Sequence, residues 1–365
     1  MKFRCERELL ADALTTAGRA ATGRSAALPV LSGVRLELTG DQLTVTGTDL
    51  DLTIQLGVTV GGDSDGGVVL PARLAAEIVR SLNDGKVEVA VATDDVSITG
   101  GRSQFSVRPL SIDDYPRLPT PATDGVTVPA ATFGEALRQV VRAASTDENR
   151  PILTGVLLTA ENDGLRMVAT DSYRLAVRDL AETQVLGAGQ KVLVPGRALV
   201  ELQRLVGAGG DLVLRLGDRD ATFEVGGTRL TTRLIEGEFP NYRGLIPSTH
   251  PNRLVVGREA LVDAVRRVKL MAREPNTPVR MAMSADGLEL VAITQDVGQA
   301  HEQLDASYEG TELTVAFNPD FLLNGVEVTP GDEIALDTVD AQKPAVVRPT
   351  SSDDFLYLLM PVRVS

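Results

Sequence analysis

The sequence has almost none of the side chains that usually build a redox, metal or nucleophilic site. Its 365 residues include one cysteine, Cys5, only two histidines and no tryptophan. A single cysteine excludes a disulfide within the chain and gives no sign of an oxidising compartment. The histidines, His250 and His301, lie far apart and lack the spacing of metal ligands. We therefore expect no metal and no cofactor.

Long apolar runs are also missing. No stretch approaches the roughly 18 apolar residues that a membrane helix needs. The first ten residues are rich in charge and lack the apolar segment of a signal peptide. We therefore expect a cytoplasmic protein with no membrane contact. Hydrophobic residues still make up 43% of the chain and aromatics only 4%, so aliphatic cores in two or three domains are expected at this length.

Positive charge is scarce over the chain as a whole. Lysine and arginine number 36 against 50 aspartates and glutamates, which gives a net charge of −14. Such a balance argues against a protein that grips nucleic acid by neutralising phosphates, because its field would repel the backbone. The total does not show where along the chain the positive charges lie, so it does not exclude a local basic surface.

What the sequence does contain is an internal repeat of about 120 residues. The dipeptide Thr48-Asp49 recurs as Thr170-Asp171 and as Thr294-Gln295, at spacings of 122 and 124 residues. Two further markers keep the same order, a proline before a helical run and a glycine before an alternating strand: Pro71, Pro195 and Pro319, and Gly85, Gly210 and Gly331. Three markers at one period predict three tandem domains.

Each repeat shows the same succession of patterns. Amphipathic helices, with apolar residues at three- and four-residue steps, are predicted at Leu9–Ala20, Phe133–Ala144 and Leu261–Ala272. Alternating strands follow, in which residues such as Val34, Leu36 and Leu38 share one face. A second helix begins at the proline, whose missing N–H has no partner at a first helical position anyway. A meander of short strands closes the repeat.

The alternation is half polar, which indicates antiparallel sheets with one solvated face. Two Pro-rich, weakly apolar segments at 117–125 and 246–252 are typical of linkers. We therefore predict an α+β chain of three helix-plus-antiparallel-sheet domains, at residues 1–122, 123–248 and 249–365.

Basic residues gather on the predicted helices. Arg73 and Arg80 lie seven residues apart and share a helix face, and Arg197 and Arg204 repeat this spacing. The windows 72–82, 133–144, 196–206 and 261–273 together carry ten basic and four acidic residues, a net charge of +6 that leaves −20 for the remainder. An ordinary solvated face is the alternative for any one helix. Recurrence at equivalent positions favours a shared basic face, although two helices do not fit, since 320–328 has no basic residue and Leu9–Ala20 has only Arg19.

Short motifs spread along the chain make it similar to a known family. They are MKF at the start, LPVLSGVRLE, LTVTGTDL, VLPARL, GRSQFSV, VATDSYRLA, EGEFPNYRGLIP and the C-terminal YLLMPVR. They stand in the family's order over essentially the whole chain and are highly specific as a set. The sequence thereby resembles the beta subunit of bacterial DNA polymerase III, the sliding clamp. The resemblance implies a non-catalytic processivity factor of DNA replication, in which two chains form a pseudo-sixfold ring around double-stranded DNA.

The implied ring passes a simple geometric check. Two helices per domain, three domains and two chains give about twelve helices, which at about 9 Å between axes form a circle roughly 35 Å across. Subtracting about 10 Å for the helix bodies leaves room for a hydrated duplex. Basic helices inside and acidic sheets outside would hold DNA by enclosure, with weak phosphate contacts and no base readout.

The resemblance also implies partners, namely the DNA polymerase, the clamp loader and repair proteins, which insert a short apolar peptide between the second and third domains. The matching positions are Leu153, Thr170, Ser172, Tyr173, Arg174, Leu175, Pro240, Leu245, Leu358, Met360, Pro361, Val362 and Arg363. An apolar surface that contains methionine can accommodate varied peptides. Two local interpretations stay open: YLLMPVR as a buried final strand, and TDSYRLA as a strand-end turn in which Asp171 accepts from backbone N–H groups.

Positions that face DNA are implied at Arg24 and Arg73. The charge pattern adds others: Arg80, Arg138, Arg142, Arg197 and Arg204. In the loop at 147–152, two acids stand where family members carry Gln and Tyr residues that touch DNA, which disfavours that contact here. For the homodimer interface the matching positions are Phe105 and Val107 of the first domain and Leu270 and Met271 of the third. Two strand edges that meet there would also cover exposed ladders.

Two other classes of function remain as alternatives. A three-domain enzyme could use the acidic Thr-Asp sites, since Asp49 and Asp51 lie two apart as a metal pair can, but the third repeat has Gln295. No GxxxxGKS/T loop, GxSxG elbow or GxGxxG fingerprint is present, so catalysis is disfavoured. A repeat protein that only scaffolds other proteins would share the peptide site but not the basic helix face. Topological binding to DNA distinguishes it from a clamp.

Overall fold

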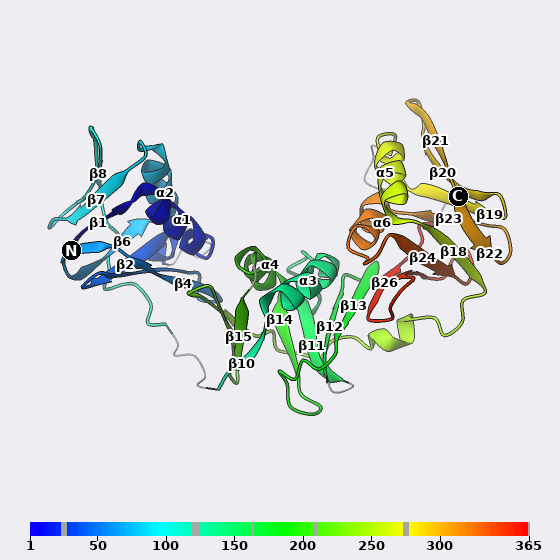
Figure 1. Ribbon diagram of the computed structural model, residues 1–365, viewed down its shortest axis with the longest axis horizontal. Coiled ribbons are helices and arrows are strands. Elements are labelled where there is room, and N and C mark those ends of the chain that lie inside the picture. The colour runs from blue at the N-terminus through cyan, green and yellow to red at the C-terminus, as the bar shows by residue number, and fades with distance from the viewer. Residues whose placement is uncertain (23–27, 119–123, 162–163, 208–209, 273–276, 364–365) are drawn as a thin grey trace. The chain divides into compact units, whose positions relative to one another are not determined.

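The computed structural model describes residues 1–22, 28–118, 124–161, 164–207, 210–272 and 277–363. These residues form six α-helices, four 3₁₀ turns and many short antiparallel strands (Figure 1). The helices are α1 (Arg7–Gly18), α2 (Ala72–Ser81), α3 (Ala130–Val140), α4 (Gly196–Leu205), α5 (Arg258–Lys269) and α6 (Pro319–Val326). The 3₁₀ turns are η1 (Pro29–Ser32), η2 (Val141–Ala143), η3 (Pro151–Thr154) and η4 (Tyr242–Leu245).

The order of elements repeats three times, as an opening strand, a helix, several strands, a second helix and three closing strands. The first repeat has β1 (Lys2–Glu6), β2 (Gly33–Thr39), β3 (Gln42–Thr48), β4 (Leu52–Thr59), β5 (Gly61–Ser64), β6 (Gly66–Pro71), β7 (Lys86–Val91), β8 (Val96–Gly100) and β9 (Ser103–Val107). The second has β10 (Val126–Pro129), β11 (Gly155–Glu161), β12 (Gly164–Thr170), β13 (Arg174–Leu180), β14 (Lys191–Pro195), β15 (Asp211–Leu216), β16 (Asp220–Val225) and β17 (Thr228–Arg233). The third has β18 (Asn252–Gly257), β19 (Val279–Ser284), β20 (Gly287–Thr294), β21 (Gly298–Leu304), β22 (Ala306–Glu309), β23 (Leu313–Phe317), β24 (Glu333–Thr338), β25 (Ala345–Pro349) and β26 (Phe355–Leu359).

Strand pairing repeats as well. The opening strand of each repeat pairs antiparallel with the strand after the second helix, in β1–β7, β10–β15 and β18–β24. The strand that precedes the second helix pairs with an earlier one, in β2–β6, β11–β14 and β19–β23. The predicted architecture of three helix-plus-antiparallel-sheet domains is therefore confirmed.

Neighbouring repeats share sheets. An eight-stranded sheet runs β10-β15-β16-β17-β4-β3-β2-β6, and its β17–β4 pairing joins the second repeat to the first. A nine-stranded sheet runs β14-β11-β12-β13-β26-β25-β24-β18-β22, and its β13–β26 pairing joins the second repeat to the third. By spatial contacts the chain therefore divides into two compact units, residues 1–132 with 201–234, and residues 133–200 with 235–365.

The helices that open the repeats begin two or three residues earlier than the periodicity predicted. α1 starts at Arg7 instead of Leu9, and α5 at Arg258 instead of Leu261. Their first turns are charged, so they carry no apolar signal. The helices also end earlier than predicted. Ala20 and Ala143 lie just beyond the helical residues of α1 and α3, yet both are fully buried, so the apolar pattern continues past the end of each helix. Apolar periodicity identifies the residues that are buried, and the helix covers only part of the segment that contains them.

The prolines occupy two kinds of position. Pro319 is the first residue of α6, as predicted for all three prolines. Pro71 and Pro195 instead close β6 and β14, one residue before their helices. A proline suits a strand end because it has no N–H to donate to the ladder. The glycine marker has one role throughout, since Gly85, Gly210 and Gly331 all have positive φ, of 124°, 95° and 88°.

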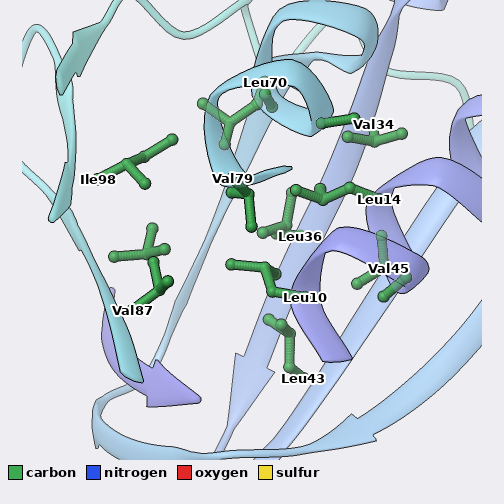
Figure 2. Close-up of a cluster of buried hydrophobic side chains, with 14 of the residues drawn as sticks. Leu10, Leu14, Val34, Leu36, Leu43, Val45, Leu70, Val79, Val87 and Ile98 are labelled. Carbon is green, nitrogen blue, oxygen red and sulfur yellow. The ribbon is translucent and has the colours of Figure 1, made fainter. Parts of the chain in front are cut away.

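The core of the first repeat lies between its helices and strands and is aliphatic. Leu10 and Leu14 of α1 and Val79 of α2 pack among strand residues such as Leu36 and Leu43 (Figure 2). The predicted inward face of β2 is confirmed, because Val34, Leu36 and Leu38 are at most 2% exposed. Each such side chain contributes about 1.5–3 kcal/mol by its burial, which fixes α1 and α2 on the sheet.

Candidate partner surface and nucleic-acid interface

The thirteen predicted peptide-contact residues, called the partner surface here, belong to the second compact unit. Those of β13 and β26 lie side by side, with Leu175 opposite Leu358 in the strand register, whereas the Val362 N–H donates to the carbonyl of Ala316 on β23 at 2.7 Å. Just beyond the strands, the Met360 N–H donates to the carbonyl of Tyr173 at 2.9 Å. The two motifs TDSYRLA and YLLMPVR, almost 190 residues apart in sequence, are thus joined along one seam.

The turn that leads into β13 is built by its own side chains. The Oδ1 atom of Asp171 accepts from the backbone N–H groups of Tyr173 and Arg174 at 2.9 and 3.0 Å. The Thr170 hydroxyl donates to the Arg174 carbonyl at 2.7 Å, and Ser172 has a φ of 81°. The strand-end turn predicted for this motif is therefore confirmed.

The same turn occurs in the first repeat. Asp49 accepts from the backbone N–H groups of Asp51 and Leu52 at 3.1 and 2.8 Å, and Leu50 has a φ of 80°. Asp296, two residues after the third marker, also has a positive φ, of 63°. The repeated Thr-Asp marker is thus a backbone-turn device, which explains its recurrence without any catalytic role.

Arg174 lies at the centre of the seam. Its Nε atom is 3.0 Å from Asp171 Oδ2, and the two side chains are only 11% and 10% exposed. Its guanidinium carbon lies 4.3 Å from the ring centroid of Phe321, and Tyr173 stacks on the same ring at 6.2 Å. A cation over an aromatic face is attracted by the ring quadrupole. The first turn of α6 is therefore bound to the turn at 170–174.

Phe321 was missing from the predicted site. It is held in place by Asn318, whose Oδ1 accepts from the Phe321 N–H at 3.2 Å, and by Tyr357, whose hydroxyl donates to its carbonyl at 2.8 Å. In the sequence it is one apolar residue in a helical run, so nothing marks it as a contact of Arg174.

Arg150 is a second residue that sequence reasoning missed. Its Nη1 atom donates to the Asp171 carbonyl and to the Ser172 hydroxyl, both at 3.3 Å. The Asp147 carboxylate lies 3.0 Å from Arg150 Nε. The backbone N–H of Asn149 and the Arg150 guanidinium lower the pKa of Asp147 below its usual range. The acidic loop therefore braces the turn of the partner surface.

Burial divides the partner surface into a floor and a rim. Leu175, Leu358 and Thr170 are at most 4% exposed, and the two leucines share an apolar cluster with Tyr242. Tyr173, Leu245 and Met360 are 59%, 48% and 37% exposed. The remaining members range from half-buried to exposed: Leu153, Ser172, Arg174, Pro240, Pro361, Val362 and Arg363. The interpretation of YLLMPVR as a buried final strand is confirmed from Tyr357 to Leu359, and Met360, directly after the strand, is exposed.

The predicted DNA-facing arginines lie on helices or helical turns, except Arg24, which lies outside the described residues. Arg73 and Arg80 are in α2, Arg138 in α3, Arg142 in η2, and Arg197 and Arg204 in α4. Seven-residue spacing places each pair on one helix face, as predicted.

Four of these arginines have carboxylate partners, of which three lie in the same windows and are already included in the net charge of +6, and only Glu327 comes from outside them. Arg73 is 2.8 Å from Glu77, Arg138 2.6 Å from Glu135, and Arg204 2.6 Å from Glu201. Arg142 pairs with Glu327, beyond the end of α6, at 3.0 Å. Arg80 donates to the Thr15 hydroxyl instead. Exposed pairs of this kind are worth about 0–1 kcal/mol each, so they leave the cations available to a competing anion.

The four predicted interface residues differ in accessibility. Phe105 is 36% exposed on β9, which is an edge strand of the five-stranded sheet β5-β1-β7-β8-β9. Val107 is only 4% exposed and packs into the core of the first repeat, so its side chain cannot form the predicted surface contact. Strand alternation places Phe105 and Val107 on the same face of β9, so their difference is one of position along the strand: Val107, at its end, pairs with the buried Val96 of β8. Leu270 is 72% exposed and Met271 is half-buried.

Among the described residues, no helix has the length and apolar character to cross a membrane. The same residues contain no cluster of three or more His, Cys, Asp or Glu side chains placed to hold a metal ion.

Comparison with known proteins agrees with this architecture. The chain matches the N-terminal, central and C-terminal domains of the DNA polymerase III beta subunit over residues 1–119, 127–241 and 243–363. Beta sliding clamps of Streptomyces coelicolor and Bacillus subtilis are 35% and 30% identical, and each alignment covers both chains in full. The crystal structure of the Bacillus subtilis clamp has a TM-score of 0.92 at 28% identity. A Bartonella birtlesii clamp bound to griselimycin has a TM-score of 0.93 at 31% identity. Both cover 100% of each chain.

A three-domain fold of this kind, matched along its full length, defines a DNA sliding clamp, a class of non-catalytic processivity factors. The chain belongs to the family of DNA polymerase III beta subunits.

Proposed function

We propose that two copies of the chain form a homodimeric ring in the cytoplasm that encircles duplex DNA without reading its sequence. The ring tethers the replicative polymerase, the clamp loader and repair proteins through the partner surface. Each chain contributes three clamp domains, at residues 1–122, 123–248 and 249–365. The observation that carries the proposal is the placement of exposed arginines on helices of a clamp-family chain whose net charge is −14.

Those arginines suit a loose hold on a phosphate backbone. The Arg73, Arg142 and Arg204 side chains are 93%, 50% and 54% exposed, each beside a carboxylate. Weak ion pairs can exchange a carboxylate for a phosphate at little cost. Contacts that form and break in this way carry no sequence information and permit sliding.

The partner surface suits a short apolar peptide. Tyr173, Leu245 and Met360 are exposed, whereas Leu175 and Leu358 are buried. The exposed side chains offer apolar contact area to the anchor residues of a peptide. Methionine adapts to differently shaped side chains. So small a contact is expected to give micromolar affinity, because association entropy offsets most of the burial. Such affinity allows partners to exchange.

The dimer is supported by unpaired sheet edges. β9 ends one sheet in the first unit, and β21 ends the sheet β21-β20-β19-β23 in the second. Leu270, one residue after α5, is 72% exposed. In a dimer with a twofold axis, the β9 edge of one copy would meet the β21 edge of the other at both interfaces. Both exposed edges would then be covered and the ring closed.

Topological retention tests the proposal. The protein is loaded on closed circular plasmid with a bacterial clamp loader and ATP, freed from unbound protein, and followed by gel filtration at moderate salt. We expect long retention on the intact circle and fast release after one restriction cut. The variant with Arg73, Arg80, Arg197 and Arg204 replaced by Ala should lose binding to linear DNA much more than retention on the circle. Equal release from intact and cut plasmid would overturn the ring and favour the scaffold alternative.

A further inference from the structure

Three arginines converge on one glutamate in the second unit. Glu327 directly follows α6, and its Oε2 atom lies 3.0 Å from Arg142 Nη1 while its Oε1 atom lies 2.9 Å from Arg266 Nη2. Arg138 donates to the backbone carbonyl of Glu327 at 3.4 Å. One carboxylate is therefore shared by a cation that follows α3 and a cation on α5.

The cations around Glu327 remain accessible. Arg142 and Arg266 are 50% and 57% exposed at their side chains, whereas Glu327 is 26% exposed. A hollow of about 430 Å³ lies between α5 and α6 beside them, lined by residues that include Arg266, Lys269, Asn324 and Glu327. Figure 1 shows the two helices next to each other. The hollow gives a second anion room to approach Arg266 without displacing the helices.

A phosphodiester group can replace this carboxylate. Both anions offer two oxygens to two guanidinium donors, and arginine binds either in a planar, charge-assisted geometry. We propose that Glu327 occupies a phosphate site formed by Arg142 and Arg266, and that the duplex backbone displaces it. Glu327 is thereby an internal competitor that lowers the affinity for DNA. This inference rests on the proposed function, which brings the helices to the duplex.

The packing of α3 against the end of α6 does not depend on the carboxylate. Gln139 Nε2 donates to the carbonyl of Val328 at 3.3 Å, and Arg138 reaches the Glu327 carbonyl. Both acceptors belong to the backbone and persist when the side chain changes. Glu327→Gln therefore removes the competing charge while it keeps shape and packing.

The sheet of the first unit offers a matched control. Glu224 on β16 is also 26% exposed, and its carboxylate is also shared by two arginines, Arg229 at 2.8 Å and Arg215 at 3.3 Å. Glu224→Gln changes the net charge by the same amount and also removes a carboxylate shared by two arginines, but on a strand instead of a helix end.

The experiment measures the affinity of each variant for a short, fluorescent linear duplex by anisotropy across a range of salt. For Glu327→Gln we expect binding that is about five- to tenfold tighter at 0.1 M salt and a salt slope steeper by about 0.9 for each phosphate gained. Glu327→Ala should bind at least as tightly. Adding Arg142→Gln and Arg266→Gln to Glu327→Gln should abolish the gain, and Glu224→Gln should match the unmodified protein.

An unchanged affinity of both Glu327 variants would overturn the inference, and so would an equal gain in Glu224→Gln, which would assign the effect to bulk charge. Retention of the unmodified protein on circular plasmid separates this failure from that of the proposed function. If retention is normal and the Glu327 variants gain nothing, only the inference is wrong. If the unmodified protein is not retained, the proposed function itself fails.

Discussion

The guanidinium of Arg174 lies over the ring of Phe321, with its central carbon 4.3 Å from the ring centroid. This contact joins the start of β13 to the first turn of α6, which belong to different repeats. Asp171 fixes the other side of the guanidinium at 3.0 Å. Burial raises the pKa of the Tyr357 hydroxyl, which stays protonated and donates to the Phe321 carbonyl. These contacts connect the turn at 170–174, which carries part of the partner surface, to the first turn of α6.

Replacing Phe321 by Leu should weaken peptide binding. The substitution removes the aromatic face under Arg174 and the stack with Tyr173, but keeps an apolar side chain. Arg174 and Tyr173 then lose the contact, worth about 1 kcal/mol, that places them before the peptide binds, so the affinity for a synthetic peptide with Leu and Phe anchors should fall, by about fivefold if that whole energy is needed to order them again on binding. Isothermal titration calorimetry measures it. Phe223→Leu, in the core of the other unit, should lower stability and leave peptide affinity unchanged. If Phe321→Leu binds the peptide with unchanged affinity, the ring has no part in the partner surface.

A single charge at Leu270 should separate the proposed dimer. Leu270 is 72% exposed, so Leu270→Asp costs little folding energy, but a buried, unpaired carboxylate at an interface costs several kcal/mol. Light scattering should show a folded monomer for this variant and a dimer for the unmodified protein. Leu9→Asp, at a leucine that is 44% exposed on α1, serves as the control and should remain dimeric. If the unmodified protein is a monomer at micromolar concentration, the ring is wrong.

Cys5 should make the first unit less stable at alkaline pH. Burial raises the pKa of its thiol to about 11 from a reference value of 9.0, because the folded state disfavours the thiolate. The thiol's contribution is therefore fully present below about pH 9 and is lost as pH rises toward 11, at about 1.4 kcal/mol per unit.

Urea unfolding of the unmodified protein and of Cys5→Ala at pH 8 and pH 10.5 measures this effect. Taking the difference between the two proteins cancels the titration of lysines and tyrosines. The stability advantage of Cys5 should shrink by about 2 kcal/mol between the two pH values. A constant difference would mean that the thiol is as well solvated in the folded state as in the unfolded chain.

The local order of the fold followed from the sequence alone. Alternation identified the buried face at Val34, Leu36 and Leu38, and periodicity found the helices with errors of a few residues at their ends. The turn at Asp171 was also predictable, because an aspartate that accepts from N–H groups two and three residues later needs no distant partner. These features depend on neighbours in sequence, whose geometry the backbone fixes.

The side-chain contacts of the site depend on residues that are distant in sequence. The charge count assigned a net basic face to the helices, but Glu327 reaches Arg142 from 185 residues away. Phe321 and Arg150 carried no signal either, since their partners come together only when β13 meets β26 and α6.

For this protein the sequence by itself determined the three repeats, their order of helices and strands, and membership of the clamp family. The tertiary structure alone decided which arginines share a carboxylate, which apolar residues form the floor of the partner surface, and that Val107 faces the core. Periodicity reports how one segment meets solvent. Pairing between distant side chains depends on the sheets that bring separate repeats together, and no local pattern encodes that distance.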